Sequence, residues 1–316
     1  MQAVILAAGK GKRLQPITLN RSKAMAPILG KPIVERVMEI LVQNDIRNFI
    51  LVVSPEDEEL ERYFQEQSAL DVELQFVAQA ERLGMAHALS LAAPYLHGDF
   101  MMSACDNLVS AQHIAELIAA HRARSAQATL SLMEIDLSQA GRTGIVEWQA
   151  GRVRRIVEKP APEEAPSNIA SLPLYLFSPH LLAYLPRVKL SARGEYELQE
   201  AIQMLIDEGG HVTGVLTNSR LQLTNSADLL ALNRHYLTTA DGLPYLKPAR
   251  LGPQTHLVSP LWIGEGAIIG PGCVIGPRVY IEGDCQIGPN VLIKDAVILR
   301  NSVIEAGRQV IGEVVA

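Results

Sequence analysis

The chain has 316 residues, of which 48% are hydrophobic and 20% are charged, so it can bury a sizeable core. Its 28 Lys and Arg against 34 Asp and Glu give a net charge of −6, which argues against non-specific binding of nucleic acid. Three cysteines are too few for a disulfide framework, and no apolar run approaches the ~18 residues of a membrane span. The N-terminal apolar run precedes the basic residues, which reverses the order of a signal peptide, so we predict a cytoplasmic protein with no membrane partner.

Strands and helices are expected to alternate along the first 240 residues. Apolar runs at 3–8, 49–53, 74–77 and 100–104 are typical of buried strands, and helical periodicity follows them at 32–41, 56–64, 86–96 and 114–122. Ser54 is placed to cap the second of these helices. The alternation predicts an α/β fold: a Rossmann-like, mainly parallel mixed sheet with helices on both faces.

A repeat of six residues follows a stretch rich in proline and glycine. Residues 241–254 hold three prolines and two glycines, and we expect them to be a linker after a first domain of residues 1–240. Beyond them, aliphatic residues recur every six positions: Leu257, Ile263, Ile269, Ile275, Ile281, Ile287 and Ile293. This period predicts a left-handed parallel β-helix of about three coils over residues 255–316. Its open sheet edges favour docking on the first domain or on another subunit, so we expect a homo-oligomer.

A loop of glycines and cations directly follows the first predicted strand. Gly9 and Gly11 allow the backbone to approach a ligand and to aim N–H groups at it. Two lysines and Arg13 add positive charge, and Lys23 follows ten residues after Arg13. The loop is neither a Walker A motif nor a Rossmann fingerprint. We interpret it as a phosphate cradle at the carboxyl end of a parallel strand, where α/β sheets bind ligands.

These residues resemble a known family. The segments LAAGKGKRLQPIT (6–18), SKAMAP (22–27) and LGKP (29–32) are similar to the N-terminal signature of sugar-1-phosphate nucleotidylyltransferases. Those enzymes join a nucleoside triphosphate and a sugar 1-phosphate to give an NDP-sugar and pyrophosphate. The resemblance extends over most of the first 240 residues, and a β-helix after the catalytic domain also occurs in several branches of the family.

The resemblance implies a role for particular residues. Nucleotide binding would fall to Leu6, Ala8, Gly9, Gly11, Gln79 and Gly84. The catalytic residues would be Arg13, Lys23 and Asp106. The sugar phosphate would be bound by Gly144, Glu158, Lys159, Asn168 and Arg193. The reaction needs two anions held together and their charge neutralised, and it needs no nucleophilic side chain.

The resemblance also implies Mg²⁺ as cofactor, with Asp106 as a ligand. Most members carry a second ligand in a Trp-x-Asp-x-Gly stretch, which an ungapped comparison replaces here by Arg220, Gln222 and Thr224. A gapped comparison with the uridylyltransferase branch makes Asn218 the second ligand, and this is the assignment we favour, with Gln222 as the alternative. If neither coordinates, the ion rests on Asp106 and phosphates alone, and activity falls.

The leading hypothesis is transfer of a nucleotidyl group to a sugar 1-phosphate, with glucose 1-phosphate and dTTP or UTP expected first. The missing Trp-x-Asp stretch motivates a second hypothesis, a catalytically weak or silent homologue that binds an NDP-sugar in a regulatory role. Two further alternatives are a mannose-1-phosphate guanylyltransferase and a bifunctional N-acetylglucosamine-1-phosphate uridylyltransferase with an acyltransferase β-helix. His256 is the only histidine in the repeat region and lies at its start, which argues against the acyltransferase.

Overall fold

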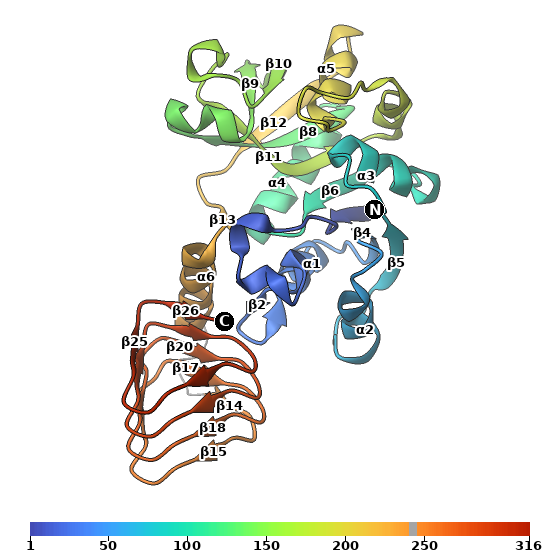
Figure 1. Ribbon diagram of the computed structural model, residues 1–316. Coiled ribbons are helices and arrows are strands. Elements are labelled where there is room, and N and C mark those ends of the chain that lie inside the picture. Colours follow the sequence, from blue (N-terminus) through green and yellow to red (C-terminus); the bar gives the residue numbers. More distant parts are fainter. Residues whose placement is uncertain (240–244) are drawn as a thin grey trace. The chain divides into compact units, whose positions relative to one another are not determined.

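The computed structural model describes residues 1–239 and 245–316 (Figure 1). The α-helices of these residues are α1 (Ile33–Val42), α2 (Glu58–Glu66), α3 (Met85–Ala92), α4 (Ala111–Ala123), α5 (Leu198–Asp207) and α6 (Ser226–Thr239). The strands before α6 are β1 (Gln2–Leu6), β2 (Pro27–Ile28), β3 (Lys31–Pro32), β4 (Asn48–Val53), β5 (Glu73–Ala78), β6 (Phe100–Ala104), β7 (Asn107–Leu108), β8 (Ala128–Glu134), β9 (Gly144–Gln149), β10 (Arg152–Glu158), β11 (Ile169–Phe177), β12 (Val212–Leu216) and β13 (Leu221–Gln222). The strands after α6 are β14 (Tyr245–Leu246), β15 (Arg250–Leu251), β16 (His256–Leu257), β17 (Leu261–Ile263), β18 (Ile268–Ile269), β19 (Val274–Ile275), β20 (Val279–Ile281), β21 (Gln286–Ile287), β22 (Leu292–Lys294), β23 (Val297–Ile298), β24 (Val303–Ile304), β25 (Gln309–Ile311) and β26 (Val314–Val315).

A nine-stranded mixed sheet organises the first part of the chain, in the order β5-β4-β1-β6-β11-β8-β12-β10-β9. Strand β1 pairs in parallel with β4 and β6, and β12 pairs in parallel with β8. Strand β11 runs antiparallel to both β6 and β8, so those two strands share a direction. The carboxyl ends of β1, β4, β6, β8 and β12 therefore lie at one edge, where α/β sheets bind ligands.

Helices cover both faces of this sheet. Leu130 and Leu132 of β8 point into a core shared with α3 and α5. The alternate residues of the same strand, Thr129 and Ser131, are buried polar groups that bond to histidines of α4 on the opposite face. The predicted α/β fold is confirmed. In the described ranges, each helix is too short or too polar to cross a bilayer.

Two local predictions need correction. Ser54 does not cap α2, which begins at Glu58; the Ser54 hydroxyl instead accepts a hydrogen bond from Arg82 Nη2 at 2.8 Å. The helix expected over 86–96 ends at Ala92, where a 3-10 turn containing Pro94 takes over. Proline has no N–H to continue an α-helix.

The six-residue repeat forms a parallel β-helix with three sheets. Their orders are β14-β17-β20-β23-β26, β15-β18-β21-β24 and β16-β19-β22-β25 in the described residues. The six isoleucines of the repeat point inward and are buried, and Leu257 packs against the same core. Stacked residues are 18 positions apart before the break in the repeat, as for Ile263 and Ile281, and 17 apart across it, as for Ile281 and Ile298. This coil is shorter by one residue at the turn where Asp295 has φ 52°, and the aliphatic residues after the turn still face inward.

The division of the chain differs from the expected one. Strands β14 and β15 pair with β17 and β18, so residues expected in the linker already form β-helix coils, whereas 241–244 lie outside the described residues. The chain forms two compact units: Met1–Gly9 with Val37–Leu221, and Lys10–Arg36 with Gln222–Ala316. The segment with the predicted phosphate cations therefore belongs to the same unit as the β-helix.

Candidate active site

In the loop after β1, packing requires glycine at one position. Gly11 has φ 60°, and a Cβ there would lie 3.0 Å from Thr18 Cγ2 and 3.1 Å from Lys23 Cβ. The Thr18 hydroxyl donates to the Gly11 carbonyl at 2.9 Å. Gly11 is therefore packed against the stem of Lys23, and Arg13 is exposed in the following 3-10 turn. Nothing lies within 4 Å of the position that a Cβ on Gly9 would take, which leaves that backbone open to a ligand.

Arg82 fixes the residues that enter this loop. Its Nε donates to the Ala8 carbonyl at 2.7 Å, and its Nη2 donates to the Ser54 hydroxyl. The Leu6 carbonyl, at the end of β1, accepts from the Cys105 N–H at 3.2 Å. Ala8 is buried as a result, and the backbone at this strand end is held from two neighbouring segments.

Gln79 and Gly84 form a turn that begins α3. Gln79 is buried, and its Nε2 lies 3.0 Å from His87 Nδ1 and donates to the Gly84 carbonyl at 3.4 Å. Gly84 has φ 97°, and a Cβ there would lie 2.7 Å from the Tyr196 carbonyl oxygen. The close approach of Tyr196 therefore requires glycine, and the structure brings both predicted base-binding residues together.

Glu158 and Gln199, whose side chains both pack against Gly144, each carry a buried acceptor without a partner. Gly144 begins β9 and pairs with Glu158 at the end of β10, which brings these two residues together. Glu158 Oε2 and Gln199 Oε1 are buried and make no hydrogen bond in the structure. Glu158 Oε2 lies 3.1 Å from the position of a Cβ on Gly144, and Gln199 Cγ and Nε2 lie 3.3 and 3.5 Å from it. Unpaired buried acceptors are costly, so a ligand that supplies hydroxyl donors would satisfy these two oxygens.

Cations surround the other oxygen of Glu158. Lys159 Nζ lies 3.2 Å and Arg193 Nη2 lies 3.4 Å from Glu158 Oε1. Arg193 also bonds Glu197 Oε1 at 2.6 Å. Burial raises the pKa of Glu158, and the Lys159 and Arg193 charges oppose that shift. The four predicted residues Gly144, Glu158, Lys159 and Arg193 thus form one cluster.

Asp106 follows β6, and the half-buried guanidinium of Arg220 lies near it. Arg220 Nε donates to Asn107 Oδ1 at 2.6 Å. Burial lowers the pKa of Arg220, and the nearby Asp106 carboxylate opposes that shift. Among the described residues, no group of three or more His, Cys, Asp or Glu is arranged to hold a metal ion. The charge of Arg220 therefore falls close to the carboxylate predicted to bind Mg²⁺.

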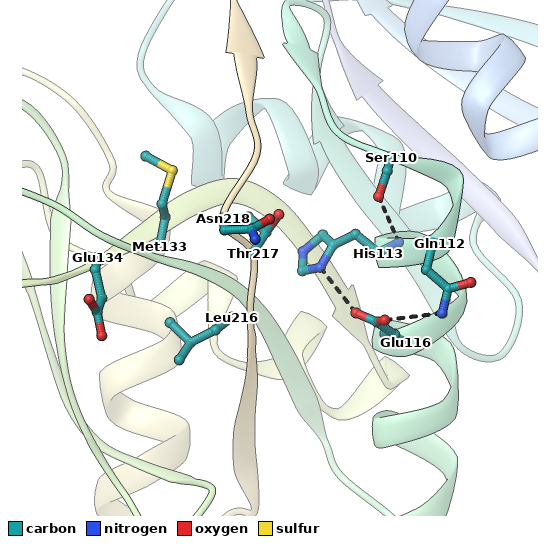
Figure 2. Close-up of a pocket in the computed structure, with 9 residues that line it drawn as sticks. All are labelled: Ser110, Gln112, His113, Glu116, Met133, Glu134, Leu216, Thr217 and Asn218. Atoms are coloured by element: carbon teal, nitrogen blue, oxygen red, sulfur yellow. Dashed lines mark hydrogen bonds and ion pairs between the residues drawn. The ribbon is translucent and has the colours of Figure 1, made fainter.

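Asn218 lines a cavity of about 730 Å³ at the end of β12, together with Ser110, Gln112, His113, Glu116, Met133, Glu134, Leu216 and Thr217. Figure 2 shows the Asn218 side chain pointing toward the His113 ring. Asp106 is not among the described residues that line this cavity. Asn168 lies in another depression, with Ser167 and residues 135–137, and Glu158 is not among the described residues that line it. Gln222 is exposed in β13.

Comparison with known proteins identifies the family. Residues 2–237 match the family described as Nucleotidyl transferase. The chain belongs to the sugar-1-phosphate nucleotidyltransferases. Residues 257–316 of this nucleotidyltransferase match a second family, described as GMPPB C-terminal domain.

Curated relatives support the same family. The nucleotidyltransferase is 34% identical over 216 residues to "UTP--glucose-1-phosphate uridylyltransferase AglF" of Haloferax volcanii, a match that covers 68% of this chain and 87% of that protein. It is 30% identical over 273 residues to "Bifunctional protein GlmU" of Methanococcus maripaludis, covering 86% of this chain and 62% of that protein. It thus spans less than two thirds of that relative's length.

Solved structures show the same fold. A UDP-glucose pyrophosphorylase complexed with UDP-glucose matches with a TM-score of 0.68 and 21% identity, over 75% of this chain and 98% of that one. A UDP-glucose pyrophosphorylase from Acinetobacter baumannii matches with a TM-score of 0.66 and 23% identity, over 76% and 94%.

Two residues beside the candidate site of this nucleotidyltransferase, Arg82 and Gln199, were not predicted from the sequence. Gln199 is a buried polar residue on the core-facing side of α5, among Leu198, Ala201 and Ile202. A glutamine on an apolar helix face was the available signal, because such a residue needs hydrogen-bond partners. No pattern in the sequence singles out Arg82, whose partners Ala8 and Ser54 are distant along the chain.

Proposed function

We propose that this nucleotidyltransferase transfers a uridylyl or thymidylyl group from UTP or dTTP to glucose 1-phosphate and releases pyrophosphate. The observation that carries the proposal is a pair of buried, unpaired acceptors, Glu158 Oε2 and Gln199 Oε1, on two side chains that pack against Gly144. Two neighbouring sugar hydroxyls are donors of the kind these oxygens lack. The name of the Haloferax volcanii relative supports the choice of glucose 1-phosphate and of a pyrimidine nucleotide.

The chemistry is an in-line displacement at phosphorus. A phosphate oxygen of the sugar 1-phosphate attacks the α-phosphorus, a new P–O bond forms, and the bond to the leaving pyrophosphate breaks. Both reactants are anions, so charge neutralisation and positioning account for most of the catalysis. Arg13 would bind the triphosphate and the leaving pyrophosphate, Lys23 the α-phosphate, and Lys159 and Arg193 the sugar phosphate.

The resemblance to the family also assigns binding of the nucleotide base to the turn from Gln79 to Gly84. Gln79 and the backbone of Gly84 would bind the base, with Leu6, Ala8 and the two loop glycines beneath the nucleotide. The bonds from Gln79 to His87 and Gly84 support this role, because they hold the amide in one orientation before a ligand arrives. Asn168 would bind a further sugar hydroxyl.

We propose Mg²⁺ as the cofactor, with Asp106 as its carboxylate ligand and Asn218, or Gln222, as its amide ligand. Mg²⁺ commonly takes one or two protein carboxylates and completes its shell with phosphate oxygens and water, so one carboxylate fits the ion. When bound, the ion would neutralise charge on the phosphates. The contribution of the protein would be the Asp106 carboxylate, which lies just after β6.

Pyrophosphate release tests the proposal. UTP, dTTP and GTP are each combined with glucose 1-phosphate, mannose 1-phosphate and N-acetylglucosamine 1-phosphate in the presence of Mg²⁺. Release that requires glucose 1-phosphate with UTP or dTTP is expected. Release only from GTP with mannose 1-phosphate, or only from UTP with N-acetylglucosamine 1-phosphate, would contradict the substrate assignment, and no release from any pair would contradict the activity.

A silent, nucleotide-binding homologue is the second candidate. The half-buried Arg220 beside Asp106 favours it, because a guanidinium disfavours a second cation nearby. Calorimetry of Mg²⁺-dependent UTP binding distinguishes the two: tight binding without pyrophosphate from any pair supports the silent homologue. An acyltransferase activity of the β-helix would require acetyl-CoA binding, which calorimetry can also measure. We also propose a homo-oligomer, and light scattering tests its mass.

A further inference from the structure

We propose that the β-helix and α6 position Lys23, by holding residues 20–31 in one conformation. The β-helix would then be part of the machinery that binds phosphate, and this inference rests on the role proposed above for Lys23. Lys23 lies in a 3-10 turn over Lys23–Met25, between Arg21 and the β2–β3 hairpin. Contacts on both sides of that turn carry the argument, and all of them lie within one compact unit of the chain.

The first contact is a two-pronged ion pair on the N-terminal side of Lys23. Arg21 Nη1 and Nη2 donate to Glu282 Oε1 and Oε2 at 2.9 and 3.0 Å. The Arg21 side chain is only 6% exposed and that of Glu282 17%. Glu282 is itself fixed, because its Oε2 accepts from the Arg300 N–H at 2.8 Å. Pairs of this geometry specify orientation more than they add stability.

The second contact is an aromatic ladder against the β2–β3 turn. Tyr245, Trp262 and Tyr280 stack along one sheet of the β-helix, with ring centroids 5.2 and 5.0 Å apart. Gly30, in the β2–β3 turn, lies so close to the Trp262 ring that a Cβ on Gly30 would be 2.5 Å from Trp262 Cζ2. The Gly30 backbone also bonds the buried Tyr280 hydroxyl. The turn therefore rests directly on the β-helix.

The third contact holds the same hairpin from α6. Asn233 Oδ1 accepts from the Leu29 N–H at 2.9 Å, and its Nδ2 donates to the Pro27 carbonyl at 3.1 Å. Leu29 has φ 49°, a conformation that side-chain-bearing residues rarely adopt, so it needs such support. Arg36 donates to the Leu29 carbonyl at 3.2 Å and lies over the Tyr236 ring of α6 at 4.6 Å.

Together these contacts fix Lys23 between two anchored ends. The aliphatic stem of Lys23 packs against Gly11, so the position of the Lys23–Met25 turn also affects the shape of the loop after β1. Arg21 lies two residues before Lys23 in the chain, and Glu282 neutralises its charge. This pairing keeps the Arg21 guanidinium from competing with Lys23 for phosphate. Ordering the turn before a ligand arrives removes an entropy cost from the reaction.

The test compares two isosteric variants of the full chain. Glu282→Gln removes the charge that pairs with Arg21. Asp295→Asn is the matched control, because Asp295 also pairs with an arginine through both oxygens, Arg278, and is 14% exposed. In the described residues Asp295 makes no bond to residues 20–31. Its Oδ1 also lies 3.5 Å from Arg234 Nε of α6, and asparagine keeps that oxygen and tolerates the positive φ.

Amide hydrogen exchange is the first readout. The N–H groups of Met25 and Ala26 donate to the Ser22 and Lys23 carbonyls, both at 3.1 Å. Glu282→Gln is expected to speed their exchange about tenfold or more, while Asp295→Asn and the amides of the nine-stranded sheet change less than about twofold. Unchanged exchange at Met25 and Ala26 would overturn the inference. This readout needs no turnover, so it decides the inference separately from the proposed function.

A double-mutant cycle with Lys23→Ala is the second readout. If Glu282 acts through Lys23, Glu282→Gln lowers kcat about tenfold in the wild-type background and has little further effect beside Lys23→Ala. Equal effects in both backgrounds would indicate a general loss of structure and would overturn the inference. If Glu282→Gln does not fold, Arg21→Lys keeps the charge and removes the two-pronged geometry, and the same exchange result decides.

Discussion

Replacing Gly144 by alanine should selectively weaken the use of sugar 1-phosphate. The new Cβ would lie 3.1 Å from Glu158 Oε2 and 3.3 Å from Gln199 Cγ. A hydroxyl that donates to a carboxylate lies about 2.5–3.0 Å from it, so the methyl takes the place of the donor oxygen. Loss of one hydrogen bond to a charged group costs about 1.5–3 kcal/mol. That range corresponds to a fall of about 10- to 150-fold in kcat/KM for the sugar phosphate.

The assay varies each substrate in turn while the other is saturating, and measures initial rates of pyrophosphate release. The KM of the nucleotide should stay within about twofold of wild type, because Gly144 does not belong to the proposed nucleotide site. Gly141→Ala is the matched control, since its Cβ would meet only the Pro160 carbonyl at 3.8 Å. A sugar-phosphate kcat/KM within about threefold of wild type, or an equal loss for both substrates, would refute the reasoning.

Three further predictions concern the loop, the metal ligand and pH. Gly11→Ala should destabilise the fold by about 1–2 kcal/mol in denaturant titrations, because φ is 60° and the Cβ meets Thr18 and Lys23; Gly98→Ala, at φ 73° with nothing within 4 Å, separates the backbone cost from that of crowding. Asp106→Asn should remove Mg²⁺-dependent turnover while circular dichroism stays unchanged, and full activity would refute the metal assignment. Burial raises the pKa of Glu158 above its usual 4.5, so this group's contribution to stability is largest below pH 4.5 and is lost as pH rises through the raised pKa. Thermal melting of wild type against Glu158→Gln should show that difference, and the opposite slope would contradict it.

The sequence predicts the two architectures well because each has a local signature. Every inward-facing isoleucine of the β-helix is set by a period of six, and this survives the break after Ile293 because the turn at Asp295 absorbs the lost residue. The alternation of apolar runs and helical patterns likewise predicts the sheet. Helix ends are predicted less well where a single residue decides them, as Pro94 does after α3.

Contacts between distant segments were beyond local patterns. Arg21 and Glu282 are 261 positions apart, and nothing in either neighbourhood indicates that they pair. Consequently the sequence placed residues 10–36 with the first domain, whereas they form one compact unit with the β-helix.

Predicted site residues lie together where a family motif coincides with local geometry. The strand pairing of Gly144 with Glu158 and the turn from Gln79 to Gly84 join residues that the family motifs had already indicated. Gln199 was missed because its importance depends on burial beside those residues, which only the packing of α5 on β10 determines. Both metal ligands, Asp106 and Asn218 or Gln222, stay predictions, because Asp106 is not among the described residues that line the cavity at Asn218.

The most direct test of the central claim is ³¹P NMR of the enzyme with UTP, glucose 1-phosphate and Mg²⁺. We expect the resonances of both substrates to decrease together and UDP-glucose and pyrophosphate to appear in equal amounts, without inorganic phosphate. Inorganic phosphate with UDP would indicate hydrolysis, and unchanged resonances would indicate binding without transfer; either result, obtained with UTP and again with dTTP, would contradict the proposed reaction.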